Sequence, residues 1–263
     1  MAGFGLNLVL GFFISGLIFL VSRWAGLPAI LTEAEGLNWL AISGYIGISF
    51  LMALLVIGVV FPMGIRGYMK LRAKPAPDEL QAHVSGLSKV SGALLSPKVF
   101  VANSKVLNAF ATPGTVVITT ALLKLLSADE IKATLAHEVS HIRSWDTIRF
   151  VLVSLTMSTL IYYVPLTVAY EMFISGMDGW KVAFHSSKAA LFLLTFLVLF
   201  AYMRKREFAA DAFAGEFGYR QPAISALERL HVAHPVGRLK QLFSTHPSVK
   251  ARVRSLASAG EPK

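Results

Sequence analysis

The chain has 263 residues, of which 55% are hydrophobic and 15% charged; its net charge is +10 and it contains no cysteine. A charged share this far below the about 25% of soluble proteins indicates an α-helical membrane protein rather than one or two soluble domains. The lack of cysteine excludes disulfides and cysteine-rich zinc clusters. The basic residues are dispersed and no nucleic-acid-binding motif accompanies them. We therefore expect them to flank membrane spans, and we predict no nucleic-acid partner.

Four apolar segments approach the about 20 residues that a spanning helix needs. We predict an N-terminal membrane hairpin over residues 1–65 and a second hairpin over residues 150–203, with spans at about 3–21, 39–63, 150–170 and 183–203. Polar residues between His185 and Lys188 shorten the fourth segment, so a buried helix or a partial membrane entry is the alternative there. The first segment lacks the initial basic residue of a signal peptide and is expected to be an uncleaved anchor.

Lysine and arginine residues gather on one side of these spans. They follow the second span, precede the third and follow the fourth, at Arg66, Lys70, Arg72, Lys74, Arg143, Arg149, Arg204, Lys205 and Arg206. The opposite loops are poor in positive charge. The positive-inside rule then places both termini, and the regions 66–149 and 204–263, in the cytoplasm. These two regions are predicted to form one cytoplasmic domain.

The region 66–149 alternates helix and strand signals. A helix is predicted at about 78–90, and strands rich in β-branched and aromatic residues at 98–102, 108–112 and 115–119. Asn103, Pro113 and Gly114 separate the strands. The region 204–263 is expected to be mostly helical. The predicted fold class is therefore an α-helical membrane protein that carries an α+β domain.

A further helix is predicted to run from Ala128 to Trp145, because no proline or glycine interrupts this stretch. Ser127 and Glu130 form a capping-box pattern at its start. Apolar residues then recur at helical spacing, at Ile131, Leu135, Ala136, Val139 and Ile142.

This helix carries the pentapeptide H-E-x-x-H, from His137 to His141. Residues four apart project from one helical face, so both imidazoles can reach a single metal ion. Glu138 then points into the same site, where it can take a proton from a metal-activated water. The motif predicts a zinc-dependent hydrolase with one Zn²⁺ per chain, if a third ligand exists.

Glu207 is the candidate for that third ligand. The metzincin extension is excluded because Ser144 and Thr147 stand where glycine and histidine are required. The other common solution is a downstream glutamate on a second helix. Glu207 fits it, because Glu207 lies just after the fourth span and His141 lies just before the third. Asp211, one helical turn later, would accept a hydrogen bond from a ligand imidazole. The alternative is that Glu207 is an ordinary carboxylate beside basic residues. His83, His185, His231 and His234 do not fit the constellation.

Taken together, these motifs resemble one family. The chain resembles the HtpX-like membrane zinc metalloproteases, within the membrane gluzincin family that includes Ste24 and Oma1. The resemblance rests on four stretches: Asn108 to Thr112, the helix from Ser127 to Asp146, Glu207 to Asp211, and Phe243 to Pro247. The turn at Pro113 and Gly114 is shorter than is usual in the family, and the chain is rather short for it.

The resemblance implies a gluzincin-type zinc protease with roles for particular residues. Zinc would be bound by His137, His141 and Glu207, with Glu138 as general base and acid. His246 would stabilise the oxyanion, the alternative being a simple helix start before Ser248. An extended substrate would pair with an edge strand, for which the candidate residues are Asn108, Ala109, Phe110, Ala111 and Thr112.

The function predicted is endopeptidase cleavage of misfolded or damaged membrane proteins at the cytoplasmic face of a bacterial inner membrane. The expected partners are membrane protein substrates, the lipid bilayer and other membrane quality-control proteases. Two alternatives stay open. One is a site-2-type intramembrane protease, which buries its motif in the bilayer; charged Arg143 and Asp146 next to the motif argue against it. The other is an inactive zinc-binding scaffold, which would have no use for Glu138.

Overall fold

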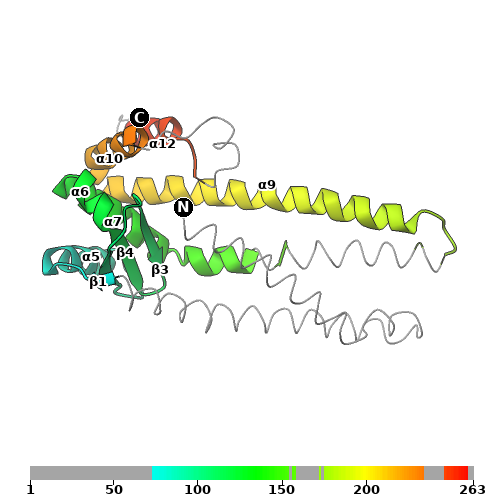
Figure 1. The fold of residues 1–263 in the computed structure, drawn as a ribbon, viewed down its shortest axis with the longest axis horizontal. Coiled ribbons are helices and arrows are strands. Elements are labelled where there is room, and N and C mark those ends of the chain that lie inside the picture. Colours follow the sequence, from blue (N-terminus) through cyan, green and yellow to red (C-terminus); the bar gives the residue numbers. More distant parts are fainter. Residues whose placement is uncertain (1–72, 154–155, 158–171, 173–174, 234–245, 260–263) are drawn as a thin grey trace. The chain divides into compact units, whose positions relative to one another are not determined.

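The computed structural model describes residues 73–153, 156–157, 172, 175–233 and 246–259 (Figure 1). The chain divides into two units, residues 1–63 with 150–199 and residues 64–149 with 200–263. Among the described helices, none has both the length and the apolar character needed to cross a membrane. The first two predicted spans, and most of the third, lie outside the described residues. The number of spans therefore stays a prediction.

The second unit contains a four-stranded sheet with the strand order β1-β2-β4-β3. Its strands are β1 (Ala73–Pro75), β2 (Lys98–Ala102), β3 (Ala109–Thr112) and β4 (Thr115–Thr119). β2 and β4 are parallel, whereas β1 and β3 pair antiparallel to β2 and β4 respectively. The sequence predicted the last three strands. It did not predict β1, which has three residues and ends in a proline, a residue confined to sheet edges.

β3 is an edge strand of this sheet, because it pairs only with β4 among the described strands. A two-residue turn connects the pair, and Thr112 lies opposite Thr115. Pro113 is followed by Gly114 with φ of 76°, which is the residue pattern of a type II turn. The short turn keeps β3 in register with a strand whose Val116, Val117 and Ile118 are fully buried.

Helices cover this sheet and supply the rest of the core. They are α5 (Asp78–Val90), α6 (Thr120–Leu125) and α7 (Ala128–Arg143). Leu135, Ala136 and Val139 are completely buried on α7, as the predicted apolar face requires. The predicted capping box is confirmed: Glu130 N donates to Ser127 Oγ at 3.4 Å, and Ser127 N donates to Glu130 Oε2 at 2.7 Å.

The helix α7 ends at Arg143, two residues earlier than predicted. A turn follows in which Trp145 has φ of 54°, the left-handed region that bulky residues rarely adopt. Such a conformation costs about 1–2 kcal/mol for a residue with a Cβ. Neither proline nor glycine causes the break, so the local sequence gave no sign of it. The turn brings the Asp146 carboxylate back to the ring of His141.

The chain returns to this unit within α9 (Trp180–Ala214), which is a single helix through the predicted boundary at residue 203. A short π-helical segment, η2 (Gly215–Tyr219), then ends it; Gly218 has φ of 87° and starts a change of direction. The chain continues into α10 (Arg220–Ala233) and, farther on, α12 (Val249–Ser258). α10 packs against both α7 and α12 (Figure 1). The described parts of the C-terminal region, residues 204–233 and 246–259, are mostly helical, as predicted.

Candidate metal centre

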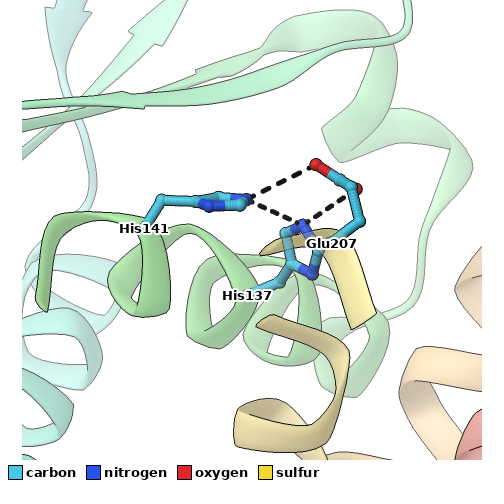
Figure 2. Close-up of side chains that lie close together, drawn as sticks. All are labelled: His137, His141 and Glu207. Carbon is cyan, nitrogen blue, oxygen red and sulfur yellow. Dashed lines mark hydrogen bonds and ion pairs between the residues drawn. The ribbon is translucent and has the colours of Figure 1, made fainter. Parts of the chain in front are cut away.

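Three side chains from two helices converge on one point in the second unit. His137 and His141 lie one turn apart on α7, and Glu207 comes from α9 (Figure 2). The two Nε2 atoms are 3.2 Å apart. Glu207 Oε2 lies 3.6 Å from His137 Nε2, and Glu207 Oε1 lies 3.7 Å from His141 Nε2. All three residues are placed so that they could hold a metal ion.

The separations fit a tetrahedral metal site. With metal–ligand bonds of about 2.0–2.1 Å, two ligand atoms in tetrahedral coordination are about 3.4 Å apart. The two Nε2 atoms are 3.2 Å apart, and each of them lies 3.6 or 3.7 Å from a different oxygen of Glu207, so the spacing is close to that value. Two histidines and one carboxylate, with a fourth position left open, are the donor set of catalytic zinc sites.

Two buried carboxylates orient the imidazole rings. Asp211 Oδ1 lies 3.0 Å from His137 Nδ1. Asp146 Oδ2 lies 2.8 Å from His141 Nδ1. When each Nδ1 donates its proton to a carboxylate, each neutral ring presents the Nε2 lone pair to the shared point. The hydrogen bonds thus select the tautomer that binds metal.

Two guanidinium groups compensate these carboxylates. Arg252 on α12 donates to both oxygens of Asp211, at 2.7 and 2.5 Å, and its Nη1 lies 3.2 Å from Glu207 Oε2. Arg206 on α9 forms an ion pair with Asp146, with Nε 2.7 Å from Oδ1. Asp211 and Asp146 are 3% and 9% exposed, so an uncompensated charge on either would be costly. The arginines therefore offset the cost of burying both carboxylates.

The ionisation states of the metal-free site follow from this arrangement. Burial lowers the pKa of His141, but the hydrogen bond to Asp146 and the charges of Glu207 and Glu138 outweigh burial and raise the pKa to about 9. Burial raises the pKa of Glu207, yet the hydrogen bond and charge of His246 and the charge of His137 hold it well below its ordinary value. A metal ion therefore competes with a proton on His141.

The proposed catalytic residues lie around the same point. Glu138 is 8% exposed on α7, next to His137. His246 lies just before α12, and its Nδ1 is 2.9 Å from Glu207 Oε2. Its side chain is 41% exposed, so solvent reaches His246 although Glu207 beside it is buried. His83, by contrast, lies with Nε2 3.2 Å from the Lys132 carbonyl and stays outside the cluster.

β3, the predicted substrate strand, packs against α7 and thus lies beside the metal helix. Ala109 to Thr112 form the strand, and Asn108 precedes it, with its carbonyl accepting a hydrogen bond from Thr119 N at 3.0 Å. An edge strand of the described sheet therefore packs against the helix that carries the two histidines.

Sequence reasoning missed Asp146, Arg206 and Arg252. Asp146 is five residues after His141, a spacing that does not share a face on a continuous helix. Arg206 and Arg252 lie among other basic residues of the chain. Two signals in the sequence could have drawn attention to them: Arg206 directly precedes Glu207, and Arg252 follows the histidine-proline pair before α12.

An H-E-x-x-H helix, a glutamate from a second helix and a neighbouring sheet edge define a gluzincin-type α+β domain. Residues 76–259 match the model of "Peptidase family M48". The chain therefore belongs to peptidase family M48.

Its relatives include several bacterial proteins of one name. The chain is similar to "Protease HtpX homolog" of Dictyoglomus thermophilum, with 34% identity over 68% of this chain and 68% of that protein. The homologue of Streptococcus gordonii is 27% identical over 90% of this chain and 94% of its own length. The match to that of Paracidovorax citrulli, at 30% identity, spans 62% of that protein, which is less than two thirds.

A solved structure shares the fold. The crystal structure of S. mikatae Ste24p aligns with a TM-score of 0.62 at 21% sequence identity, covering 95% of this chain and 64% of that chain. At this identity the likeness concerns the fold alone.

Proposed function

We propose that the protein is a membrane-anchored, zinc-dependent endopeptidase. One observation carries the proposal: the Nε2 atoms of His137 and His141 and the carboxylate of Glu207 lie close enough together to hold one metal ion, and the helix of the two histidines packs against β3, an edge strand among the described strands. The chain belongs to a peptidase family, which supports the same conclusion. His137, His141 and Glu207 would hold one zinc ion per chain.

A zinc ion bound there would polarise the scissile carbonyl and acidify a water molecule. Glu138 would take the proton of that water and deliver it to the leaving amine, as a general base and then acid. Asp211 and Asp146 hold the two imidazoles so that their Nε2 atoms keep facing the site. His246 is the candidate donor to the developing oxyanion, because its ring contacts Glu207 and is partly exposed.

The substrate would bind as an added strand. The edge of β3 that no described strand pairs with would offer backbone donors and acceptors to an extended peptide, and such pairing tolerates many sequences. Such recognition suits unfolded segments, whose backbone is not yet paired. We infer that the substrates are misfolded or damaged membrane proteins with segments exposed at the cytoplasmic face.

The membrane location is proposed from the sequence, with both termini and the metal site in the cytoplasm and the spans in a bacterial inner membrane. The pattern of apolar segments and basic flanks supports it. On α9, Leu193, Leu194 and Leu197 are 61%, 53% and 58% exposed, as side chains facing lipid would be.

The test compares wild-type protein with Glu138→Gln in proteoliposomes that contain an unfolded membrane-protein substrate. We expect Glu138→Gln to keep one zinc per chain and to lose about 10²–10⁴-fold in cleavage rate. Asp129→Asn, at an exposed carboxylate on the same helix, is the control and should cleave like wild type. A zinc-loaded Glu138→Gln protein that cleaves as fast as wild type would overturn the assignment of Glu138.

Metal stoichiometry separates the remaining alternatives. Glu207→Ala should lose zinc, because two histidines alone make a weak site; a site-2-type enzyme would take its third ligand from an aspartate instead and would keep its zinc. An inactive scaffold would bind zinc in wild-type protein yet cleave no substrate. A proteomic comparison of membranes that contain wild-type or Glu138→Gln protein would then identify the natural substrates.

A further inference from the structure

The turn that follows α5 presents two apolar side chains to solvent. Val90 and Leu94 are 76% and 81% exposed, whereas Leu87 on the same helix is 7% exposed and belongs to the core. We call residues 89–95 the Leu94 turn. A single exposed valine or leucine is ordinary on a protein surface. Two in one short turn form a small apolar patch, and its surroundings indicate what covers it.

The Leu94 turn is a defined structure. Ala93 N donates to Ser88 O at 2.9 Å, and Gly92 N donates to Lys89 O at 3.3 Å, which is the hydrogen-bond pattern of a Schellman motif. Gly92 has φ of 69°, the left-handed conformation that this motif places at the end of a helix. Hydrogen bonds therefore fix the turn, and the exposure of its two apolar side chains is a feature of the folded chain.

The Leu94 turn lies against the end of α7 that leads to the third predicted span. Arg143 Nε donates to Ser91 O at 2.9 Å. Leu95 lies around one small hollow together with Trp145 and Thr147. The apolar segment that is predicted to cross the membrane begins at residue 150, shortly after these residues. The patch is therefore on the part of the second unit from which the chain would enter the bilayer.

The charges near the Leu94 turn are positive. Four basic side chains there are exposed: Lys89, Lys98, Arg143 and Arg149. No aspartate or glutamate occurs between residues 80 and 128, and between residues 139 and 153 the single acidic residue is Asp146, which is buried and paired with Arg206. Basic residues bind the anionic headgroups of the cytoplasmic leaflet, and tryptophans such as the partly exposed Trp145 are enriched at the membrane interface. The charge and the apolar patch are thus complementary to an anionic bilayer surface.

We propose that the Leu94 turn is a membrane contact of the second unit, in which Val90 and Leu94 enter the interface of an anionic bilayer and the basic residues bind its headgroups. The proposal rests on the proposed membrane location and goes beyond it, because the turn lies outside every predicted span. The contact holds the end of α7 that carries His141 close to the headgroups. Peptide segments are then cut near the membrane surface.

The test uses single cysteines, which can be labelled cleanly because the chain contains no other. Val90→Cys and Leu94→Cys each carry a polarity-sensitive fluorophore, in full-length protein reconstituted into nanodiscs of phosphatidylcholine and phosphatidylglycerol. We expect both labels to be quenched by lipids that carry a nitroxide about 5–10 Å below the headgroups, the depth of an interfacial apolar face. Quenching by iodide in water should be at least about twofold weaker than at an exposed position of the same protein.

Val106→Cys supplies that exposed position. Val106 is also apolar, is 59% exposed, and lies in the loop between β2 and β3. β2 begins at Lys98, close to the Leu94 turn, and ends at Ala102, so the Val106 loop follows the opposite end of this strand. Its label should be quenched by iodide and not by the nitroxide lipids. Equal lipid quenching at Val106 and Leu94 would overturn the proposal, because lipid would then contact the unit without selecting the turn.

A charge variant tests the headgroup contact. In the labelled Leu94→Cys protein, Lys89→Glu should shift the equilibrium between the inserted and the free turn by at least about fivefold toward the free form. Lys105→Glu is the matched control, since Lys105 is an exposed lysine beside Val106. Both variants change exposed residues, and equal melting temperatures would verify that they fold. Equal effects of the two variants, or unchanged quenching in nanodiscs of phosphatidylcholine alone, would refute recognition of an anionic surface.

An alkaline carbonate wash of cell membranes separates this contact from the predicted spans. If the protein resists the wash while iodide quenches the Leu94 and Val106 labels equally, the Leu94 turn is refuted and the membrane location stands. If the protein is washed out although its Leu94 label is quenched by nanodisc lipid, the spans are refuted and the turn stands as a peripheral contact. Labels that are shielded from both iodide and lipid would reveal a protein on this surface, such as a second copy of the chain, and would overturn the proposal.

Discussion

Asp146 is expected to control metal affinity through the ring of His141. Its carboxylate accepts from His141 Nδ1 at 2.8 Å and pairs with Arg206 Nε at 2.7 Å, and Asp146 is only 9% exposed. Removing such a partner of a metal-binding histidine typically costs 10–100-fold in metal affinity. Asp146→Ala should therefore weaken zinc binding by about 1.4–2.7 kcal/mol. Asp146→Asn, whose amide oxygen can still accept the hydrogen bond, should lose less.

The assay is competition for zinc with a chelator of known affinity, followed by the absorption spectrum of the cobalt-substituted protein. Glu130→Gln is the matched control. Glu130 is a buried carboxylate on the same helix that pairs with Ser225 Oγ at 2.5 Å and Arg229 Nε at 2.8 Å, away from the metal centre. It should lower thermal stability without changing zinc affinity or the cobalt spectrum. Equal losses of zinc affinity in the two variants would refute the reasoning, because Asp146 would then act only through general stability.

Three further predictions concern stability. The folded-state pKa of His141, about 9, lies above the ordinary 6.5, so in metal-free protein the protonated ring contributes about 3 kcal/mol to the free energy of unfolding. This contribution is fully present below pH 6.5 and is lost as pH rises through 9. Urea unfolding across this range should show the loss, and saturating zinc should abolish the pH dependence. Arg252→Ala should destabilise the protein by about 3–5 kcal/mol, because Asp211 would keep a buried, unpaired charge. Arg252→Lys should restore little of that in a thermal melt, since an ammonium group cannot form the two-pronged contact. Ser127→Ala should cost about 1 kcal/mol in the same measurement by removing the cap from Glu130 N, and an unchanged melting temperature would contradict this.

The helix that carries the metal-binding histidines could be predicted because its determinants are local. Ser127 and Glu130 cap each other within one turn, and the buried face of α7 recurs at helical spacing. Once the segment is helical, His137 and His141 share a face whatever the rest of the chain does. The strands β2 to β4 could be read for a similar reason, since their β-branched runs end at turn residues such as Pro113 and Gly114.

The third ligand and the carboxylates that orient the rings depend on contacts between distant segments. Glu207 was proposed from spacing and topology, but the 3.6 and 3.7 Å approaches to the histidines exist only because α9 lies beside α7 in the fold. Asp146 could not be found from a helical pattern, since it reaches His141 through the left-handed turn at Trp145. Arg252 comes from a helix 41 residues beyond Asp211.

By itself, then, the sequence determined a capped helix that presents two imidazoles and a glutamate, because hydrogen bonds and side-chain periodicity within a few residues decide those features. The tertiary structure decided which other charges surround that helix, because burial makes each of Asp146, Asp211 and Glu207 depend on a partner from elsewhere in the chain. It also decided that β3 lies at an edge of the described sheet, since the order of strands in a sheet is set by packing and not by local preference.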